Sequence, residues 1–208
     1  GFASCHIANN LRFHPVVAAL RKELACDPPV AAEIHCGQYL PDWRRGRDYR
    51  QSYSASLGRG GGVLRDLSHE LDYALWIFGA WRRVAAIGGH VSLLDIESDD
   101  AWSLLIECDG CPMLTLHVNY LDRIPRRDIH VVTQRNSYAA DLLAGTLFSL
   151  AGTCSYPVNA DDTYLAEHRA VLSGGESELC TEQEALQVMR LIESVELAAA
   201  TKQWVSAK

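Results

Sequence analysis

Residues 60–79 constrain the fold of this sequence more than any other stretch, because glycines, helical periodicity and ionisable side chains coincide there. Three glycines, Gly60 to Gly62, open the stretch and allow positive φ or close backbone approach. Apolar residues at three- and four-residue steps then predict one amphipathic helix, and Gly79 fits its C-terminal cap. The apolar stripe consists of Leu64, Leu67, Leu71, Leu75 and Phe78. The chain must therefore supply a core for one face of this helix.

The ionisable side chains of the same stretch suggest proton-transfer chemistry. Asp66, His69, Glu70 and Asp72 fall within seven residues, and Asp66 and His69 are about one helical turn apart on one face. A carboxylate in that position can orient an imidazole for general acid–base catalysis. On spacing alone, a helix with ordinary surface charges and one hydrogen-bonded histidine is the commoner explanation.

Two other kinds of site are weaker interpretations of this stretch. His69, Asp66 and Asp72 could supply a nitrogen and two oxygens to a metal, but one histidine is a sparse ligand set for zinc. The glycine run lacks the Lys-Ser/Thr of a phosphate-binding loop and the spacing of a dinucleotide fingerprint. We therefore predict no metal site and no cofactor-binding residues in this chain.

Length and composition define the class of protein. With 208 residues and 48% hydrophobic content, the chain can bury a sizeable core. A net charge of −7 and a pI near 5.6 provide no general attraction to nucleic acid or anionic membranes. No apolar run approaches the roughly 18 residues of a spanning helix, and the start lacks a signal-peptide pattern. We predict a cytoplasmic protein without a nucleic-acid or membrane partner.

The seven cysteines are scattered, unlike the dense framework of a small secreted domain, so we predict mostly reduced, buried thiols. The close pair Cys108 and Cys111 would need a second pair to form a zinc site. Asp109-Gly110 between two apolar runs instead predicts a hairpin turn.

Periodicity elsewhere predicts helices and strands in separate parts of the chain. Helical patterns cover residues 14–24, 162–172 and 181–201. The last begins with a capping-box-like pattern at Thr181 and places Met189 in the core.

Two-residue alternation predicts strands at 30–40, 84–91, 101–108, 112–121, 128–135 and 137–143, and residues 1–7 resemble the end of another strand. Short links favour antiparallel pairing. One strongly apolar face must be covered by helices or a partner sheet, and it includes Leu104, Ile106, Leu114, Leu116 and Val118. We predict one α+β domain over residues 1–208, an open, largely antiparallel mixed sheet with helices packed on one face.

Residues 41–57, PDWRRGRDYRQSYSASL, have the composition of a binding loop. The stretch holds four arginines, one tryptophan and two tyrosines but few aliphatic residues. Guanidinium and aromatic groups suit recognition of sugar, carboxylate or phosphate groups, and long loops in compact domains are often lids or binding loops. A solvated surface loop with stacked arginines is the alternative.

The order of motifs resembles the C-terminal domain of the glucose-fructose oxidoreductase, inositol dehydrogenase and rhizopine-catabolism (Gfo/Idh/MocA) family. It runs from NLRFHP at 10–15, through GGGVLRDLSHELDYALWIFG at 60–79 and a series of strands, to the terminal helix EALQVMRLIESVELAAATKQWV. The resemblance covers nearly the whole chain. It implies an α/β substrate domain whose open sheet often forms the oligomer interface, preceded by a Rossmann domain that holds NAD or NADP.

The resemblance also implies roles for individual residues. His69 matches the family's catalytic histidine, and Asp66 matches the accompanying aspartate, three residues before the histidine rather than the four of many members. Asp72 and Arg12 match further motif positions and are expected among the substrate-binding residues. The loop is similar to that of members acting on sugars of bacterial surface polysaccharides. Its expected substrate contacts are Trp43, Arg47, Tyr49, Arg50 and Tyr53.

The sequence departs from the family's full pattern, because it contains neither a GxGxxG motif after a strand nor a Glu-Lys-Pro motif. These residues alone are therefore expected neither to bind a dinucleotide nor to turn over substrate. The leading hypothesis is the substrate-binding and oligomerisation domain of an NAD(P)-dependent oxidoreductase that acts on a sugar, sugar derivative or cyclitol. The alternatives are a non-catalytic, sheet-mediated dimerisation module and a metal-dependent sugar isomerase or hydrolase.

Overall fold

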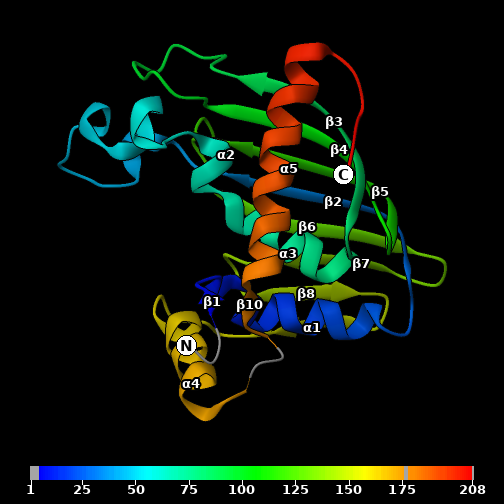
Figure 1. Ribbon diagram of the computed structural model, residues 1–208. Helices are drawn as coiled ribbons and strands as arrows, with labels where there is room; N and C mark the ends of the chain where they lie inside the picture. The colour runs from blue at the N-terminus through cyan, green and yellow to red at the C-terminus, as the bar shows by residue number, and fades with distance from the viewer. Residues whose placement is uncertain (1–4, 176–177, 208) are drawn as a thin grey trace.

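The structure is a computed structural model that describes residues 5–175 and 178–207. Within these residues, one nine-stranded open sheet carries helices across one face (Figure 1). Its strands, in spatial order, are β11 (Val205–Ser206), β3 (Trp81–Gly89), β4 (Ala101–Cys108), β5 (Cys111–Asn119), β2 (Pro29–Gly37), β6 (Arg126–Thr133), β7 (Ser137–Asp141), β8 (Thr146–Ser149) and β9 (Gly152–Ser155).

Pairing in this sheet is antiparallel except between β2 and β5, which run parallel in the register Ala32 to Leu114. The predicted open, largely antiparallel mixed sheet is therefore confirmed. The hairpin at Asp109-Gly110 is also confirmed, because Cys108 pairs with Cys111 across the β4–β5 turn. Strands β8 and β9 were not predicted, since each has only four residues.

The predicted helices form, with one correction. The helices are α1 (Pro15–Leu24), α2 (Val63–Asp66), α3 (Ser68–Phe78), α4 (Asp162–Ser173) and α5 (Glu182–Thr201). The single helix predicted after Gly62 is wrong, because Leu67 (φ −101°, ψ 30°) separates α2 from α3. Leu64, Leu67 and Leu71 are nevertheless all buried. The apolar stripe thus continues across a break that hydrophobic spacing does not reveal.

The core lies between the sheet and the helices. The predicted apolar sheet face is confirmed, because Leu104, Ile106, Leu114, Leu116 and Val118 are each at most 2% exposed. Helix α5 begins with the predicted capping box between Thr181 and Glu184. Its buried stripe is Val188, Leu191, Ile192, Val195 and Ala198. Met189, which was expected in the core, is 47% exposed, because it lies about 100° around the helix from Val188.

The start of the described chain forms a small separate sheet. Strand β1 (His6–Ile7) pairs antiparallel with β10 (Cys180–Thr181), and the first four positions of the strand predicted at 1–7 lie outside the described residues. The 3-10 helix η1 (Asn10–Phe13) follows. Of the seven cysteines, four are buried: Cys36, Cys108, Cys111 and Cys180. Within residues 5–175 and 178–207, no helix is long and apolar enough to cross a bilayer.

Candidate active site

The break between α2 and α3 places Asp66 and His69 on the wall of one cavity. Asp66 ends α2, His69 is the second residue of α3, and both are half-buried. The cavity has a volume of about 290 Å³. Most of its other lining residues come from η1, β2, the loop after β2 and the start of β6, and include Asn10, Cys36, Trp43, Arg126 and Arg127. Two groups predicted from the sequence thus meet at one hollow, which we call the His69 cavity.

His69 is oriented by Asn9, a residue that the sequence analysis missed. The Nδ1 atom of His69 and the Oδ1 atom of Asn9 are 3.2 Å apart. Because an amide oxygen can only accept, this contact assigns a proton to Nδ1 and leaves Nε2 as the basic nitrogen. Asn9 is held in turn, since its backbone N–H donates to Oε1 of Glu167 on α4 over 2.7 Å.

Asp66 is oriented by Tyr120, not by His69. The buried hydroxyl of Tyr120 donates to Oδ2 of Asp66 over 2.6 Å. Burial and the hydrogen bond to Asp66 raise the pKa of Tyr120, so the phenol stays protonated and remains the donor. Among the described residues, the hydrogen bonds of His69 and Asp66 go to Asn9 and Tyr120, and the catalytic role expected for Asp66 stays a prediction. The break at Leu67 gives the two side chains different partners.

An ion pair between half-buried Arg127 and buried Glu70 lies at the same cavity. Arg127 Nε is 2.9 Å from Oε1 of Glu70, whose side chain is fully buried. The charge of Glu70 raises the pKa of Arg127. The neighbouring Cys36 thiol has its pKa raised by burial and then by Glu70, so it stays a protonated, unreactive thiol. The charge of Glu70 is thus balanced by that of Arg127.

Arg12 and Asp72 lie below the surface and bind each other. Arg12 Nε is 2.8 Å from Asp72 Oδ2, and Nη2 is 2.7 Å from Oδ1. A third contact of 3.0 Å joins Nη1 to Oε1 of Glu184. Because both members of the pair are about 2% exposed, the structure places these two predicted substrate contacts out of reach of a molecule at the surface. Their contacts instead tie η1 to α3 and α5.

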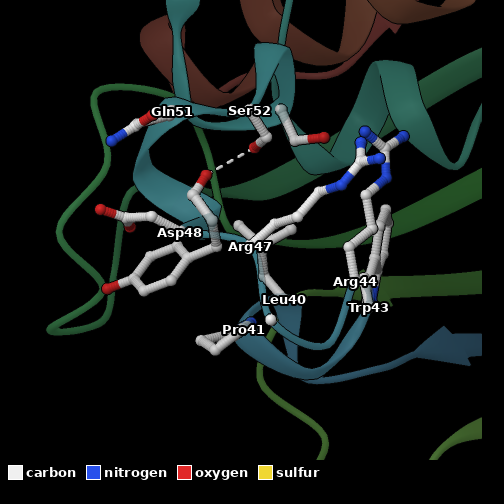
Figure 2. A pocket seen from close by; sticks show the side chains of 11 residues that line it. Leu40, Pro41, Trp43, Arg44, Arg47, Asp48, Gln51 and Ser52 are labelled. Carbon is white, nitrogen blue, oxygen red and sulfur yellow. Dashed lines mark hydrogen bonds between the residues drawn. The ribbon is translucent and has the colours of Figure 1, made fainter.

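The loop after β2 surrounds a second cavity of about 520 Å³, which we call the loop cavity (Figure 2). It folds as a series of 3-10 turns: η2 (Leu40–Asp42), η3 (Tyr49–Gln51), η4 (Tyr53–Ala55) and η5 (Leu57–Arg59). Trp43, Arg47 and Tyr49 line the cavity as expected, together with Arg44, which the sequence analysis did not single out. Trp43 lines both cavities, so the two hollows adjoin.

Arg50 and Tyr53 occupy other positions in the loop. Arg50 binds both oxygens of Asp48 over 2.8 Å and reaches Oδ2 of Asp95 at 3.5 Å. Its guanidinium therefore braces the loop. Tyr53 is close to Asp66: burial and the charge of Asp66 raise its pKa, while the charge of Arg44 acts in the opposite direction. Tyr53 thus interacts electrostatically with one group from each cavity, Asp66 and Arg44.

Gly61 and Gly62 are packed against protein atoms and leave no room there for a dinucleotide phosphate. A Cβ on Gly61 would lie 2.1 Å from the Tyr53 carbonyl oxygen, and one on Gly62 would lie 2.1 Å from Oδ1 of Asp99. The backbone N–H of Leu64 donates to Oδ2 of Asp99 over 3.0 Å. A carboxylate thus already occupies the start of α2, where a phosphate cradle would need open N–H groups. These residues do not fit the phosphates of NAD or NADP.

The carboxylates and histidines also do not assemble a metal centre. Across the described residues, no group of three or more His, Cys, Asp and Glu side chains is placed to hold a metal ion. Asp66 and Asp72 are held by Tyr120 and Arg12, respectively.

Residues 19–139 match the family model of the GFO/IDH/MocA C-terminal domain, and this chain belongs to that family. A sequence comparison with curated proteins found no match.

Solved structures share the fold. Levoglucosan dehydrogenase in complex with NADH and levoglucosan has a TM-score of 0.81 at 14% identity, with 97% of this chain and 66% of that chain covered. An oxidoreductase from Thermotoga maritima has a TM-score of 0.79 at 15% identity, covering 97% of this chain and 61% of its own. UDP-N-acetylglucosamine 3-dehydrogenase from Acidithiobacillus ferrooxidans has a TM-score of 0.74 at 20% identity, with coverages of 95% and 62%. This chain therefore spans 61–66% of the length of these three proteins.

Proposed function

We propose that this chain is the substrate-binding domain of an NAD(P)-dependent oxidoreductase acting on a hydroxyl or carbonyl group of a sugar, sugar derivative or cyclitol. The supporting observation is that His69 and Asp66 meet at one cavity in a chain of this family. Similar folds occur in dehydrogenases of levoglucosan and of UDP-N-acetylglucosamine, one of them bound to NADH. NAD or NADP, which would take up or supply the hydride, would be held by residues outside this domain.

In this proposal His69 moves the substrate proton. Its Nδ1–H is directed to Asn9, so Nε2 can accept the hydroxyl proton during oxidation and return it in the reverse reaction. Asp66, held by Tyr120, is a fixed acceptor for a substrate hydroxyl at the same cavity. Arg12 and Asp72 act as positioning residues beneath the site, because they join the segments that carry Asn9 and His69.

The acid–base role is tested by His69→Ala and His69→Gln in the complete enzyme. Because general acid–base catalysis typically contributes 10²–10⁴, we expect kcat to fall by at least about 100-fold in both variants. His168→Ala is the matched control, since His168 is exposed on α4, and should leave kcat unchanged. If His69→Ala retained kcat within about tenfold of the native enzyme, the assigned role would be refuted.

We also propose that the sheet face opposite the helices joins copies of this chain into a homo-oligomer. Ile87, Leu105 and Met113 expose large apolar side chains from three adjacent strands, and apolar patches of this kind mark interaction surfaces. Leu105→Asp should shift the sedimentation coefficient toward the monomer. Leu93→Asp, a control in the β3–β4 connection, should not. Equal assembly of Leu105→Asp and the native chain would refute the interface.

This interface would equally serve a non-catalytic dimerisation module. Such a module predicts unchanged assembly after His69→Ala and no affinity for sugars. Kinetics and sedimentation of the same His69 variants therefore separate it from the enzyme domain.

A further inference from the structure

Two arginines of the loop cavity are held together by a tight turn. The backbone N–H of Arg47 donates to the carbonyl oxygen of Arg44 over 3.1 Å, and Gly46 adopts φ +81° between them. A turn closed in this way brings the first and last of its four Cα atoms within about 7 Å. Figure 2 shows both side chains extending in the same general direction beside the cavity. The turn thus presents two cationic groups on one side of the loop.

These two guanidinium groups have no acidic partner among the described residues, in contrast to most arginines near the candidate site. Arg12, Arg50, Arg126 and Arg127 are each bound to a carboxylate. Asp48, the carboxylate nearest in sequence to the turn, already binds Arg50 through both oxygens. Two neighbouring positive charges without a counter-charge repel each other and favour a bound anion.

The arginine pair lies next to the proposed reaction centre. Trp43 lines both the loop cavity and the His69 cavity, and its ring meets Tyr120 edge-on with centroids 5.2 Å apart. Tyr120 in turn holds Asp66. A molecule reacting at His69 could therefore extend past Trp43 to the arginines.

We propose that Arg44 and Arg47 form an anion subsite that binds the phosphate or carboxylate group of an acidic sugar whose reacting hydroxyl lies at His69. The proposal rests on the proposed function and narrows its substrate class. Guanidinium groups match both anions, because each can donate paired, charge-assisted hydrogen bonds. Trp43 provides an aromatic surface between the two ends. Arg50, which was expected to contact the substrate, is replaced in that role by Arg44.

The test is a calorimetric titration of the full chain with four probes: glucose, glucuronate, glucose 1-phosphate and UDP-glucose. We expect at least one acidic probe to bind at least about tenfold more tightly than glucose, as a charge-assisted hydrogen bond allows. Affinity for that probe should weaken as the salt concentration rises from about 0.05 M to about 0.5 M, because screening shortens the range of the attraction. A comparison of the affinity for glucuronate with the affinities for glucose 1-phosphate and UDP-glucose shows whether the subsite prefers a carboxylate or a phosphate group.

Matched variants locate the subsite. Arg44→Gln and Arg47→Gln should each weaken binding of the acidic probe by about tenfold or more. Arg45→Gln should leave it nearly unchanged, because Arg45 lies in the same turn but does not line the cavity. All three positions are exposed, so thermal midpoints should stay the same and exclude misfolding as a cause.

The outcomes are distinct from those of the His69 test, because the titration measures binding without turnover. Equal affinity for glucose and every acidic probe would overturn the subsite, as would equal losses in the Arg45 and Arg44 variants. If an acidic probe binds preferentially and the His69→Ala enzyme is still active, the subsite is supported. The acid–base role of His69 is then refuted.

Discussion

The buried pair of Arg12 and Asp72 makes the most demanding prediction about stability. Asp72→Asn keeps the shape of the side chain but removes the charge that meets the guanidinium at 2.7 Å and 2.8 Å. Arg12 is 2% exposed, so water cannot replace the lost partner. The remaining contact to Glu184 reaches only one nitrogen, and Glu184 is itself 43% exposed.

The magnitude follows from leaving a buried charge without its partner. Such changes cost about 3–5 kcal/mol, and at about 2–4 °C per kcal/mol for a chain of this size the thermal midpoint should fall by roughly 6–20 °C. The double variant Arg12→Met with Asp72→Leu removes both charges. Its free energy of unfolding should fall less than that of Asp72→Asn alone, because no lone charge stays buried. Thermal and urea unfolding followed by circular dichroism measure both variants.

Arg82→Gln is the matched control, because Arg82 and Asp109 form an ion pair at the surface. Exposed pairs contribute little, so its unfolding midpoint should be nearly unchanged. The prediction is refuted if the free energy of unfolding of Asp72→Asn is lower than that of the native chain by less than about 1 kcal/mol. It is also refuted if the double variant is as unstable as Asp72→Asn.

Two further predictions concern backbone crowding and pH. Gly61→Ala should destabilise the chain by about 1–3 kcal/mol, because its Cβ would lie 2.1 Å from the Tyr53 carbonyl oxygen. Gly58→Ala, which enters open space, is the control, and equal urea midpoints for the two variants would contradict the prediction. Burial lowers the pKa of His14 below its ordinary 6.5, so the folded state favours the neutral ring. This contribution to stability is present above about pH 6.5 and is lost as pH falls through the folded-state pKa. Urea unfolding between about pH 8 and pH 5 should therefore show a smaller acid loss for His14→Gln than for the native chain, and an equal loss would count against it.

Local patterns predicted most of the regular structure. The capping box at Thr181 and Glu184 marks the start of α5, and the Asp109-Gly110 turn joins β4 to β5. These features depend on neighbouring residues in the chain, so spacing alone reveals them. Met189 shows where local spacing fails, because the face of an amphipathic helix that is buried depends on what the helix packs against.

The candidate site shows the same difference between features that local sequence reveals and features that depend on packing. The sequence by itself singled out His69, Asp66 and the arginine-rich loop as candidates, because those residue types cluster in two short stretches. It did not identify their partners: Asn9 is 60 residues from His69, and Tyr120 is 54 residues from Asp66. It also did not separate Arg50, which is neutralised by Asp48, from Arg44, which has no acidic partner among the described residues.

Residues 60–79 thus determined which ionisable side chains are present near the site. The tertiary structure decided which partners those side chains have. The break at Leu67 turns one predicted acid–base pair into two separately held groups at one cavity. Hydrogen bonds between distant segments depend on folded geometry, which has no signature in local spacing. Which side chains are paired, buried or free for a ligand is therefore decided only when the sheet and helices assemble.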